Sequence, residues 1–237
     1  MAAGMDAARG TEELTLDDVK AALRRGARVT LLVRHAERPK MDPNDATFGD
    51  ALAITDEGRR TSRAFGCALA AFGAAASFYA SPLTRTRMTA AEIAAGMNRV
   101  GAAIPTDERL GNGSFYYADA AQVLEVFKPQ NFFPASFEYF ATGAQRGFRD
   151  LYEATDDFER WINENAKTPL FIVVTHDLYI AAFLAARHAV KEFTRENWTR
   201  FLDAGAIIDE PTGVRRYGLV RTGFSTGIVG VVLTKGN

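Results

Sequence analysis

The chain has 237 residues, of which 47% are hydrophobic and 24% are charged, and this content suits one α/β domain with a buried core. Its formal net charge is -1, so the overall charge attracts neither nucleic acid nor an anionic membrane. Any anion site must therefore be a local cluster of basic side chains.

Several features bear on the compartment of the protein. No segment is apolar over a length that could span a bilayer, and residues 1–18 lack the basic and apolar regions of a signal peptide. The single cysteine, Cys67, cannot form an internal disulfide and lies in an apolar helical stretch, so we expect a buried thiol. We therefore expect a cytoplasmic protein, with residues 1–14 loose and residues 15–237 forming one domain.

The first half of the chain alternates helical and strand patterns. Thr15 suits the cap of a helix that ends near Arg25, and the β-branched run 29–33 suits a strand buried on both faces. The remaining elements expected here are a loop over 39–54, a helix capped by Thr55 that runs to about Phe72, a strand at 77–80, a helix at 83–97 and a short strand at 102–105.

The second half contains one segment that breaks this alternation. Residues 111–148 mix glycine, proline and aromatic residues, which predicts short helices and loops with an aromatic cluster, and a cap over an active site. The other expected elements are helices at 149–166 and 179–187 and strands at 170–175, 205–209, 214–220 and 228–234. This order predicts a three-layer α/β/α sandwich whose central sheet is mostly parallel, with an antiparallel edge from the closing strands.

Three charged clusters each come directly after a predicted strand. They are Arg34-His35-Ala36-Glu37-Arg38 after 29–33, Arg85 and Arg87 after 77–80, and His176-Asp177 after 170–175. Ligands of open α/β sheets bind at the carboxyl ends of the strands, so we expect the three clusters to form one site.

The residue types in these clusters suit phosphoryl transfer. Arginine binds a phosphate dianion through two parallel hydrogen bonds and neutralises charge in the transition state. Neutral histidine is a competent nucleophile near pH 7. A carboxylic acid can protonate the leaving oxygen and then accept a proton from water.

The order of these motifs resembles the histidine phosphatase superfamily, also called phosphoglycerate mutase-like. The resemblance rests on RHAE after the first buried strand, SPLTRTRMTA, VTHD after a later strand and ITDEGRR at 54–60, and it covers about residues 28–190. It implies a phosphatase that needs no metal and no cofactor and acts on a small phosphorylated substrate.

The resemblance also implies residue roles. His35 would form a phosphohistidine, Arg34 and Arg85 would bind the phosphoryl oxygens, and His176 would be the second phosphate-binding histidine. Arg38 would be a third phosphate-binding arginine, whereas Arg87 falls at a variable position. Ala36 stands where the family commonly has glycine, and a small side chain is still kept there.

Two carboxylates compete for the role of proton donor. One family branch, which includes the mutases, uses a glutamate in the middle of the chain, for which Glu108 is the candidate. The acid phosphatase branch uses an aspartate directly after the second histidine, which here is Asp177. The combination of Arg38-Pro39 with His176-Asp177 is closer to the second pattern, so we favour Asp177.

Three alternatives to a phosphatase stay open on the sequence alone. A mutase would return the phosphoryl group to its substrate, although Arg38-Pro39-Lys40 replaces the residues that mutases usually have there. An inactive domain would only bind a phosphorylated ligand. A metal hydrolase could use His35, His176, Glu37 and Asp177, although the surrounding arginines would repel a divalent cation. The oligomeric state is not readable from the sequence.

Overall fold

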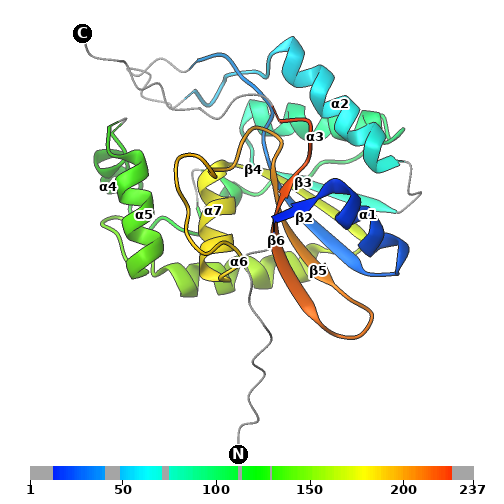
Figure 1. Ribbon diagram of the computed structural model, residues 1–237. Coiled ribbons are helices and arrows are strands. Elements are labelled where there is room, and N and C mark those ends of the chain that lie inside the picture. Colours follow the sequence, from blue (N-terminus) through cyan, green and yellow to red (C-terminus); the bar gives the residue numbers. More distant parts are fainter. Residues whose placement is uncertain (1–12, 41–48, 71–74, 112–113, 129, 226–237) are drawn as a thin grey trace, which may run out of the picture.

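Figure 1 shows a computed structural model of the protein, in which a central sheet carries helices on both faces. The structure describes residues 13–40, 49–70, 75–111, 114–128 and 130–225. The strands are β1 (Glu13–Thr15), β2 (Arg28–Arg34), β3 (Ala76–Ala80), β4 (Leu170–Thr175), β5 (Ala204–Asp209) and β6 (Arg215–Arg221). The helices are α1 (Leu16–Arg24), α2 (Asp56–Ala70), α3 (Thr84–Gly96), the 3₁₀ helix η1 (Glu108–Leu110), α4 (Ala120–Val126), α5 (Phe132–Thr142), α6 (Leu151–Asn165) and α7 (Asp177–Ala186). Within these ranges, no helix combines the length and apolar character that a membrane span requires.

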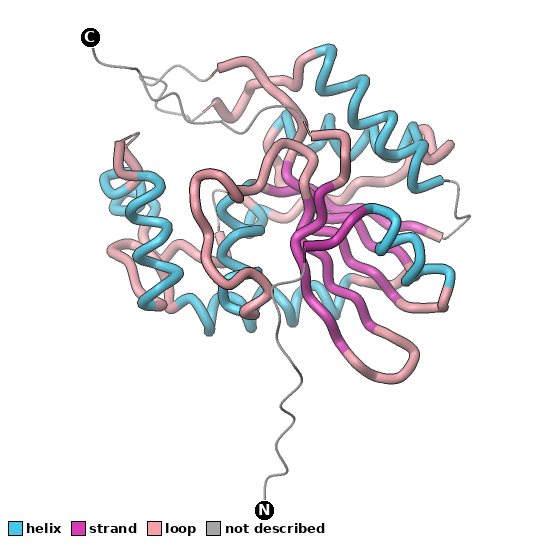
Figure 2. The backbone as a smooth tube through the Cα atoms, in the orientation of Figure 1, coloured by secondary structure: helices cyan, strands magenta, loops and turns pink. Residues whose placement is uncertain are grey.

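The strands form one sheet in the order β1-β6-β5-β2-β4-β3. Parallel pairs join β2 to β4, β4 to β3 and β1 to β6, whereas β5 is antiparallel to both of its neighbours, β2 and β6. Only β5 therefore runs against the other described strands. This mostly parallel sheet between two helical layers confirms the predicted sandwich (Figure 2). The antiparallel strand is internal rather than at the edge, because β6 and β1 continue the sheet beyond β5.

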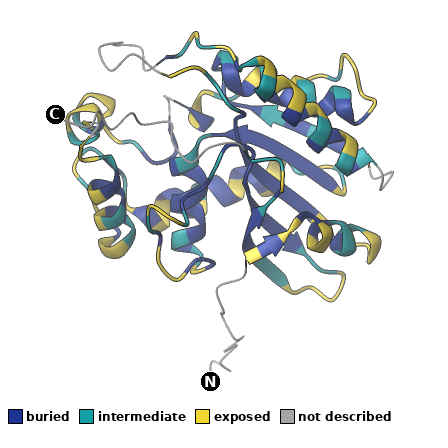
Figure 3. Cartoon of the chain, turned by 45° about the horizontal axis from the view of Figure 1, so that its top comes forward, coloured by how far each residue is buried: buried dark blue, intermediate teal, exposed yellow. Residues whose placement is uncertain are grey.

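The strand β4 shows how the centre of the sheet is buried on both faces. Its side chains Phe171 and Val173 belong to the core beneath α6 and α7. Its side chains Leu170, Ile172 and Val174 belong to the core beneath α1, α2 and α3. A continuous apolar run is what a central parallel strand requires, and Figure 3 shows the strands of the sheet centre as buried.

The helices α2 and α3 pack with almost no space between their backbones. A Cβ atom on Gly66 would lie only 2.1 Å from the carbonyl oxygen of Ile93. This contact fixes the rotation of α2, so that Phe65 and Leu69 are buried on the same side. Cys67 is the next residue after Gly66 and so points about 100° away from it around the helix axis. Its side chain is exposed, so the prediction of a buried thiol is wrong.

The N-terminal boundary differs from the prediction. Residues 13–15 form β1, where Leu14 pairs with Val220, so the loose segment predicted over 1–14 is wrong for its last two residues. Residues 1–12 lie outside the described part of the chain. Thr15 then caps α1 as predicted, because its hydroxyl oxygen accepts from the backbone N–H of Asp18, whose carboxylate accepts from the N–H of Thr15.

Two other strand predictions have different outcomes. Residues 102–105 form no strand, and the next residue, Thr106, makes an isolated parallel bridge to Ala80 at the end of β3. The chain therefore passes the carboxyl end of β3 without adding a strand to the sheet. The strand predicted at 228–234 lies outside the described residues.

The predicted cap region contains the short helices α4 and α5, which stand beside α7 (Figure 1). The two ends of this region are joined, because Tyr117 and Phe148 form an antiparallel bridge. Its rings are continuous with the main core rather than a separate cluster, as shown by Phe133, whose ring centroid lies 5.2 Å from that of Trp198. The role of residues 111–148 as a cap remains a prediction.

Candidate active site

The carboxyl ends of β2, β3 and β4 lie next to one another at one edge of the sheet, because β4 pairs in parallel with both other strands. Arg34 ends β2, His176 follows β4, and Arg85 lies in the first turn of the helix that follows β3. The structure thus brings the three charged clusters together. The ring centroids of His35 and His176 are 5.5 Å apart.

The imidazole of His35 is buried and held in a defined tautomer. Its Nδ1 atom lies 2.8 Å from the carbonyl oxygen of Ala36, and a carbonyl can only accept, so Nδ1 carries the proton. The lone pair is therefore on Nε2. Burial, followed by the charges of Arg85, His176 and Arg34, holds the pKa of His35 well below its ordinary value. The ring is neutral at pH 7, as a nucleophile must be.

The guanidinium of Arg34 is buried and only partly neutralised. One Nη atom donates to the carbonyl oxygen of Thr199 at 2.6 Å, and the other lies 3.0 Å from the carboxylate of Asp177. Its Nε atom is buried without a hydrogen-bond partner. Burial lowers the pKa of Arg34, while the charges of Asp177 and Asp203 oppose that shift. A buried donor of this kind suits an anionic ligand.

Two further arginines reach the same edge of the sheet. Arg85 is buried, donates to the carbonyl oxygen of Gly49 at 2.7 Å, and has a pKa lowered to about 10, mainly by burial and then by the charge of Arg38. Arg38 is half-buried, and burial followed by the charge of Arg34 lowers its pKa. Arg87 is exposed, in keeping with its variable position in the motif.

The second histidine is oriented by a serine. The Nε2 atom of His176 lies 3.1 Å from the hydroxyl oxygen of Ser81, which is itself buried and bonded to the hydroxyl of Thr86. Burial, then the charges of Arg85 and other arginines of the site, hold the pKa of His176 well below its ordinary value. The site therefore contains two neutral imidazoles among cationic side chains.

The two carboxylate candidates occupy different surroundings. The Oδ2 atom of Asp177 lies 3.0 Å from Arg34 and accepts from the indole N–H of Trp198 at 3.2 Å. Glu108 is exposed at the start of η1, and among the described residues it makes no ion pair with the site arginines. The structure places η1 beside β4, since the hydroxyl of Thr175 donates to the carbonyl oxygen of Leu110.

Sequence reasoning missed the contribution of the loop before β5. The ring of Phe201 lies 5.5 Å from that of His35, and the guanidinium of Arg34 lies 4.4 Å from its centroid. The backbone of Thr199 and the indole of Trp198 also contact site residues. These residues follow a helix and a turn with no motif of their own, so no local signal pointed to them. Ser81, by contrast, is part of the Ser-Pro-Leu motif and could have been found.

Among the described residues, no group of three or more histidine, cysteine, aspartate or glutamate side chains is arranged to hold a metal ion. Glu37, one member of the metal set considered from the sequence, accepts a hydrogen bond from the hydroxyl of Thr55 at 3.1 Å.

The comparison with known families agrees with the motifs. The family model of the histidine phosphatase superfamily (branch 1) matches residues 30–205, which include every predicted site residue. The chain belongs to the histidine phosphatase superfamily. A sequence comparison with curated proteins gives no match.

Solved structures of other histidine phosphatase-like proteins share the fold. A mycobacterial glucosyl-3-phosphoglycerate phosphatase has a TM-score of 0.53 and 14% identity, over 83% of this chain and 99% of that one. A phosphoglycerate mutase from Bacillus anthracis has a TM-score of 0.53 and 13% identity, over 84% of this chain and 95% of that one. A phosphoserine phosphatase from Entamoeba histolytica has a TM-score of 0.51 and 13% identity, over 83% and 98%. At such identities the likeness shows the fold alone.

Proposed function

We propose that the protein is a metal-independent phosphatase that hydrolyses a small phosphomonoester through a phosphohistidine on His35. The observation that carries this proposal is the state of His35, a buried neutral imidazole whose Nδ1–H is bound to the carbonyl of Ala36. The nucleophilic lone pair on Nε2 is thereby available without a separate base. Membership in the superfamily supports the same chemistry.

The substrate group in this proposal is a phosphate dianion. Arg34, Arg38 and Arg85 supply three positive charges at the carboxyl edge of the sheet, where Asp50, Asp177 and Asp203 are the nearby carboxylates. Because these arginines are buried or half-buried, a dianion bound beside them is stabilised more strongly than it would be in water.

The proposed reaction has two steps. The Nε2 atom of His35 attacks phosphorus, the bond from phosphorus to the ester oxygen breaks, and the leaving oxygen takes a proton from a carboxylic acid. Water then attacks the phosphohistidine, the P–N bond breaks, and the water proton passes to the carboxylate. Inorganic phosphate leaves, and the histidine and the acid are restored.

The proton donor in this proposal is Asp177, with Glu108 as the alternative. Asp177 lies beside the phosphate-binding Arg34, whereas Glu108 is exposed. In this structure Arg34 holds the carboxylate of Asp177, and a bound dianion would compete for the same guanidinium and free the carboxyl group to face the leaving oxygen.

A phosphatase is favoured over a mutase by the residues that follow the nucleophile. Arg38-Pro39-Lys40 differs from the usual mutase pattern, and the Arg38 side chain is half-buried at the site. The aromatic-rich residues 111–148 are proposed as a cap that selects the substrate, since the bridge of Tyr117 to Phe148 joins the two ends of this segment. The cytoplasm remains the proposed compartment, on the basis of the single cysteine.

The direct test is to trap the intermediate. The protein is mixed with ³²P-labelled substrate and quenched in alkali, where a phosphohistidine survives, and a parallel sample is then treated with acid, which should release the label. We expect labelling of wild type and of His188→Ala, and none of His35→Ala. His188 is a matched control because it follows the far end of α7.

Turnover of p-nitrophenyl phosphate in EDTA is measured alongside the labelling. Activity that persists with the chelator supports the metal-independent mechanism, and its loss would contradict it. A label found on a residue other than His35, or retained in His35→Ala, would refute the assignment of the nucleophile. A label with no net hydrolysis would favour the mutase, whereas binding of inorganic phosphate with neither label nor hydrolysis would favour an inactive binding domain.

A further inference from the structure

Residues 197–203, called the 197–203 loop, connect the region after α7 to β5 and form one wall of the site. The backbone of this loop is bonded to Arg34 at three points: the carbonyl of Thr199 accepts from its guanidinium, the carbonyl of Asp203 accepts from its N–H at 2.9 Å, and the N–H of Leu202 donates to its carbonyl at 3.2 Å. The ring of Phe201 also covers both Arg34 and His35. The position of Arg34 therefore depends on this loop.

The conformation of the loop requires support from outside it. Leu202 has a φ of 64°, in the left-handed region that a branched side chain rarely adopts. A backbone state of this kind persists only when the surrounding contacts over-determine it. The left-handed turn at Leu202 places Phe201 against the nucleophile and turns the chain into β5.

The support comes from Arg221, the last residue of β6. Its guanidinium donates to the carbonyl oxygens of Asn197 at 2.8 Å and Trp198 at 3.2 Å, and to the carboxylate of Asp203 at 2.5 Å. These partners lie at both ends of the 197–203 loop. A single planar guanidinium thus fixes the start and the end of the loop at once.

The carboxylate of Asp203 is fully buried and satisfied by several donors. Besides Arg221, it accepts from the backbone N–H of Arg200 at 2.9 Å and from the hydroxyl of Ser225 at 2.5 Å. A buried charge is stable only when it is paired and hydrogen-bonded. The pair of Arg221 and Asp203 is therefore a structural unit whose members depend on each other.

We infer that Arg221 and Asp203 are positioning residues for phosphoryl transfer, which hold the 197–203 loop and through it the guanidinium of Arg34 and the ring of His35. This inference rests on the proposed function of the site. Neither residue touches the substrate in this scheme. Their effect reaches the reaction because a displacement of about 1 Å at a group that stabilises the transition state can cost about 100-fold in rate.

The sequence offers a matched control on the same strand. Arg215 begins β6 and is likewise a networked arginine, bonded to Asp209 at 2.5 Å and to Glu159 at 2.9 Å, but it lies at the opposite end of the sheet from the site. Arg215→Ala therefore removes a comparable set of ionic contacts without touching the 197–203 loop.

The experiment compares Arg221→Ala, Arg221→Lys and Arg215→Ala with wild type. For each we measure kcat and KM for p-nitrophenyl phosphate, the Kd for inorganic phosphate, and Tm. We expect kcat/KM to fall by about 100-fold in Arg221→Ala and to change by less than about 3-fold in Arg215→Ala, although both lower Tm. Arg221→Lys keeps the charge but cannot bond both loop ends, so we expect an intermediate loss.

Rescue separates positioning from general destabilisation. Guanidinium ion at millimolar concentration should restore part of kcat in Arg221→Ala and leave Arg215→Ala unchanged. Equal losses in Arg221→Ala and Arg215→Ala would overturn the inference. If Arg221→Ala does not fold, Arg221→Lys decides, since wild-type kcat/KM in that variant would also overturn it.

Failure of the proposed function looks different. In that case wild type itself would neither turn over p-nitrophenyl phosphate nor bind inorganic phosphate. An active wild type with an unaffected Arg221→Ala rejects only the positioning role.

Discussion

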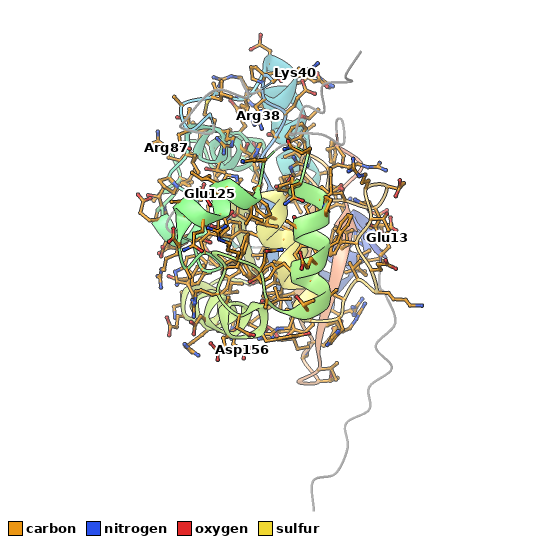
Figure 4. All side chains as sticks on the ribbon, turned by 90° about the vertical axis from the view of Figure 1, so that its left-hand side faces the viewer. Glu13, Arg38, Lys40, Arg87, Glu125 and Asp156 are labelled. Carbon is orange, nitrogen blue, oxygen red and sulfur yellow. The ribbon has the colours of Figure 1, made fainter. Side chains whose placement is uncertain are left out.

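The two ends of the central sheet are both rich in arginine, but their charges are balanced differently. At the carboxyl end, burial lowers the pKa of Arg34, Arg38 and Arg85. At the opposite end, hydrogen bonds with Asp209 and the charge of Glu159 raise the pKa of Arg215. Figure 4 shows Arg38 near the top of the molecule and Asp156, an ion-pair partner of the far end, near the bottom.

The two ends differ in how far their positive charges are matched by carboxylates. At the far end, Glu159 accepts from Arg187 and Arg215 and from the hydroxyl of Tyr217, so the positive charges there are matched by carboxylates within the chain. At the carboxyl end the matching is incomplete, because burial lowers the pKa of Arg34, Arg38 and Arg85 in spite of the nearby carboxylates. An incompletely matched cationic cluster favours a bound anion, whereas a matched network favours stability.

The largest expected effect is the loss of activity when an arginine is removed at the carboxyl end, compared with the removal of an arginine at the far end. Arg34→Ala should lower kcat/KM for p-nitrophenyl phosphate by about 10³-fold, because the transition state loses a preorganised charge-assisted donor. Arg187→Ala, which breaks ion pairs at the far end, should lower Tm but change kcat/KM by less than about 3-fold. Circular dichroism confirms that each variant is folded. A loss of kcat/KM below 10-fold in Arg34→Ala would contradict the proposal that the arginines of the carboxyl end serve catalysis and those of the far end stability.

The second effect separates the two candidate proton donors. Asp177→Asn should lower kcat by about 100-fold on an alkyl phosphate, whose leaving oxygen needs a proton, and by much less on p-nitrophenyl phosphate. Glu108→Gln is the paired variant and should leave both rates near wild type.

The dependence on the leaving group is decisive because Asp177 also contacts Arg34. An equal loss on both substrates would mean that Asp177 only positions Arg34. A loss confined to Glu108→Gln would transfer the role of proton donor to Glu108.

The smallest effect concerns stability as a function of pH. His35 and His176 have lowered pKa values in the folded protein, so below about pH 6.5 the unfolded chain binds more protons than the folded one. The free energy of unfolding should therefore fall as the pH drops through 6.5, by at most about 1.4 kcal/mol per pH unit for each histidine.

Urea unfolding at pH 7.5, 6.5 and 5.5 measures this dependence. The variant His35→Gln/His176→Gln should show a flatter profile than wild type, whereas His188→Gln should not. An unchanged slope in the double variant would mean that the two imidazoles are not the source. Added inorganic phosphate should weaken the dependence in wild type, because a bound dianion favours protonated histidine.

Much of the fold could be predicted because its signals are local. The apolar runs of β2 and β4 are long and β-branched, and each ends in a charged cluster, so the edge where Arg34 and His176 meet followed from strand direction alone. Local chemistry also predicted the cap of α1 at Thr15. The strand expected at 102–105 was wrong because a short apolar run does not reveal whether a neighbouring strand has room to pair with it.

The sequence by itself determined the α/β class, the family and the residues that gather at the carboxyl edge, because these depend on the pattern along the chain. Only the tertiary structure decided which arginines are matched by carboxylates, that Cys67 is exposed, and that the 197–203 loop supports Arg34. The partners in each case are remote in sequence, as with Glu159 and Arg215 or Trp198 and Arg221. Arginine side chains at the two ends of the sheet therefore have pKa values shifted in opposite directions, because the fold places different groups around them.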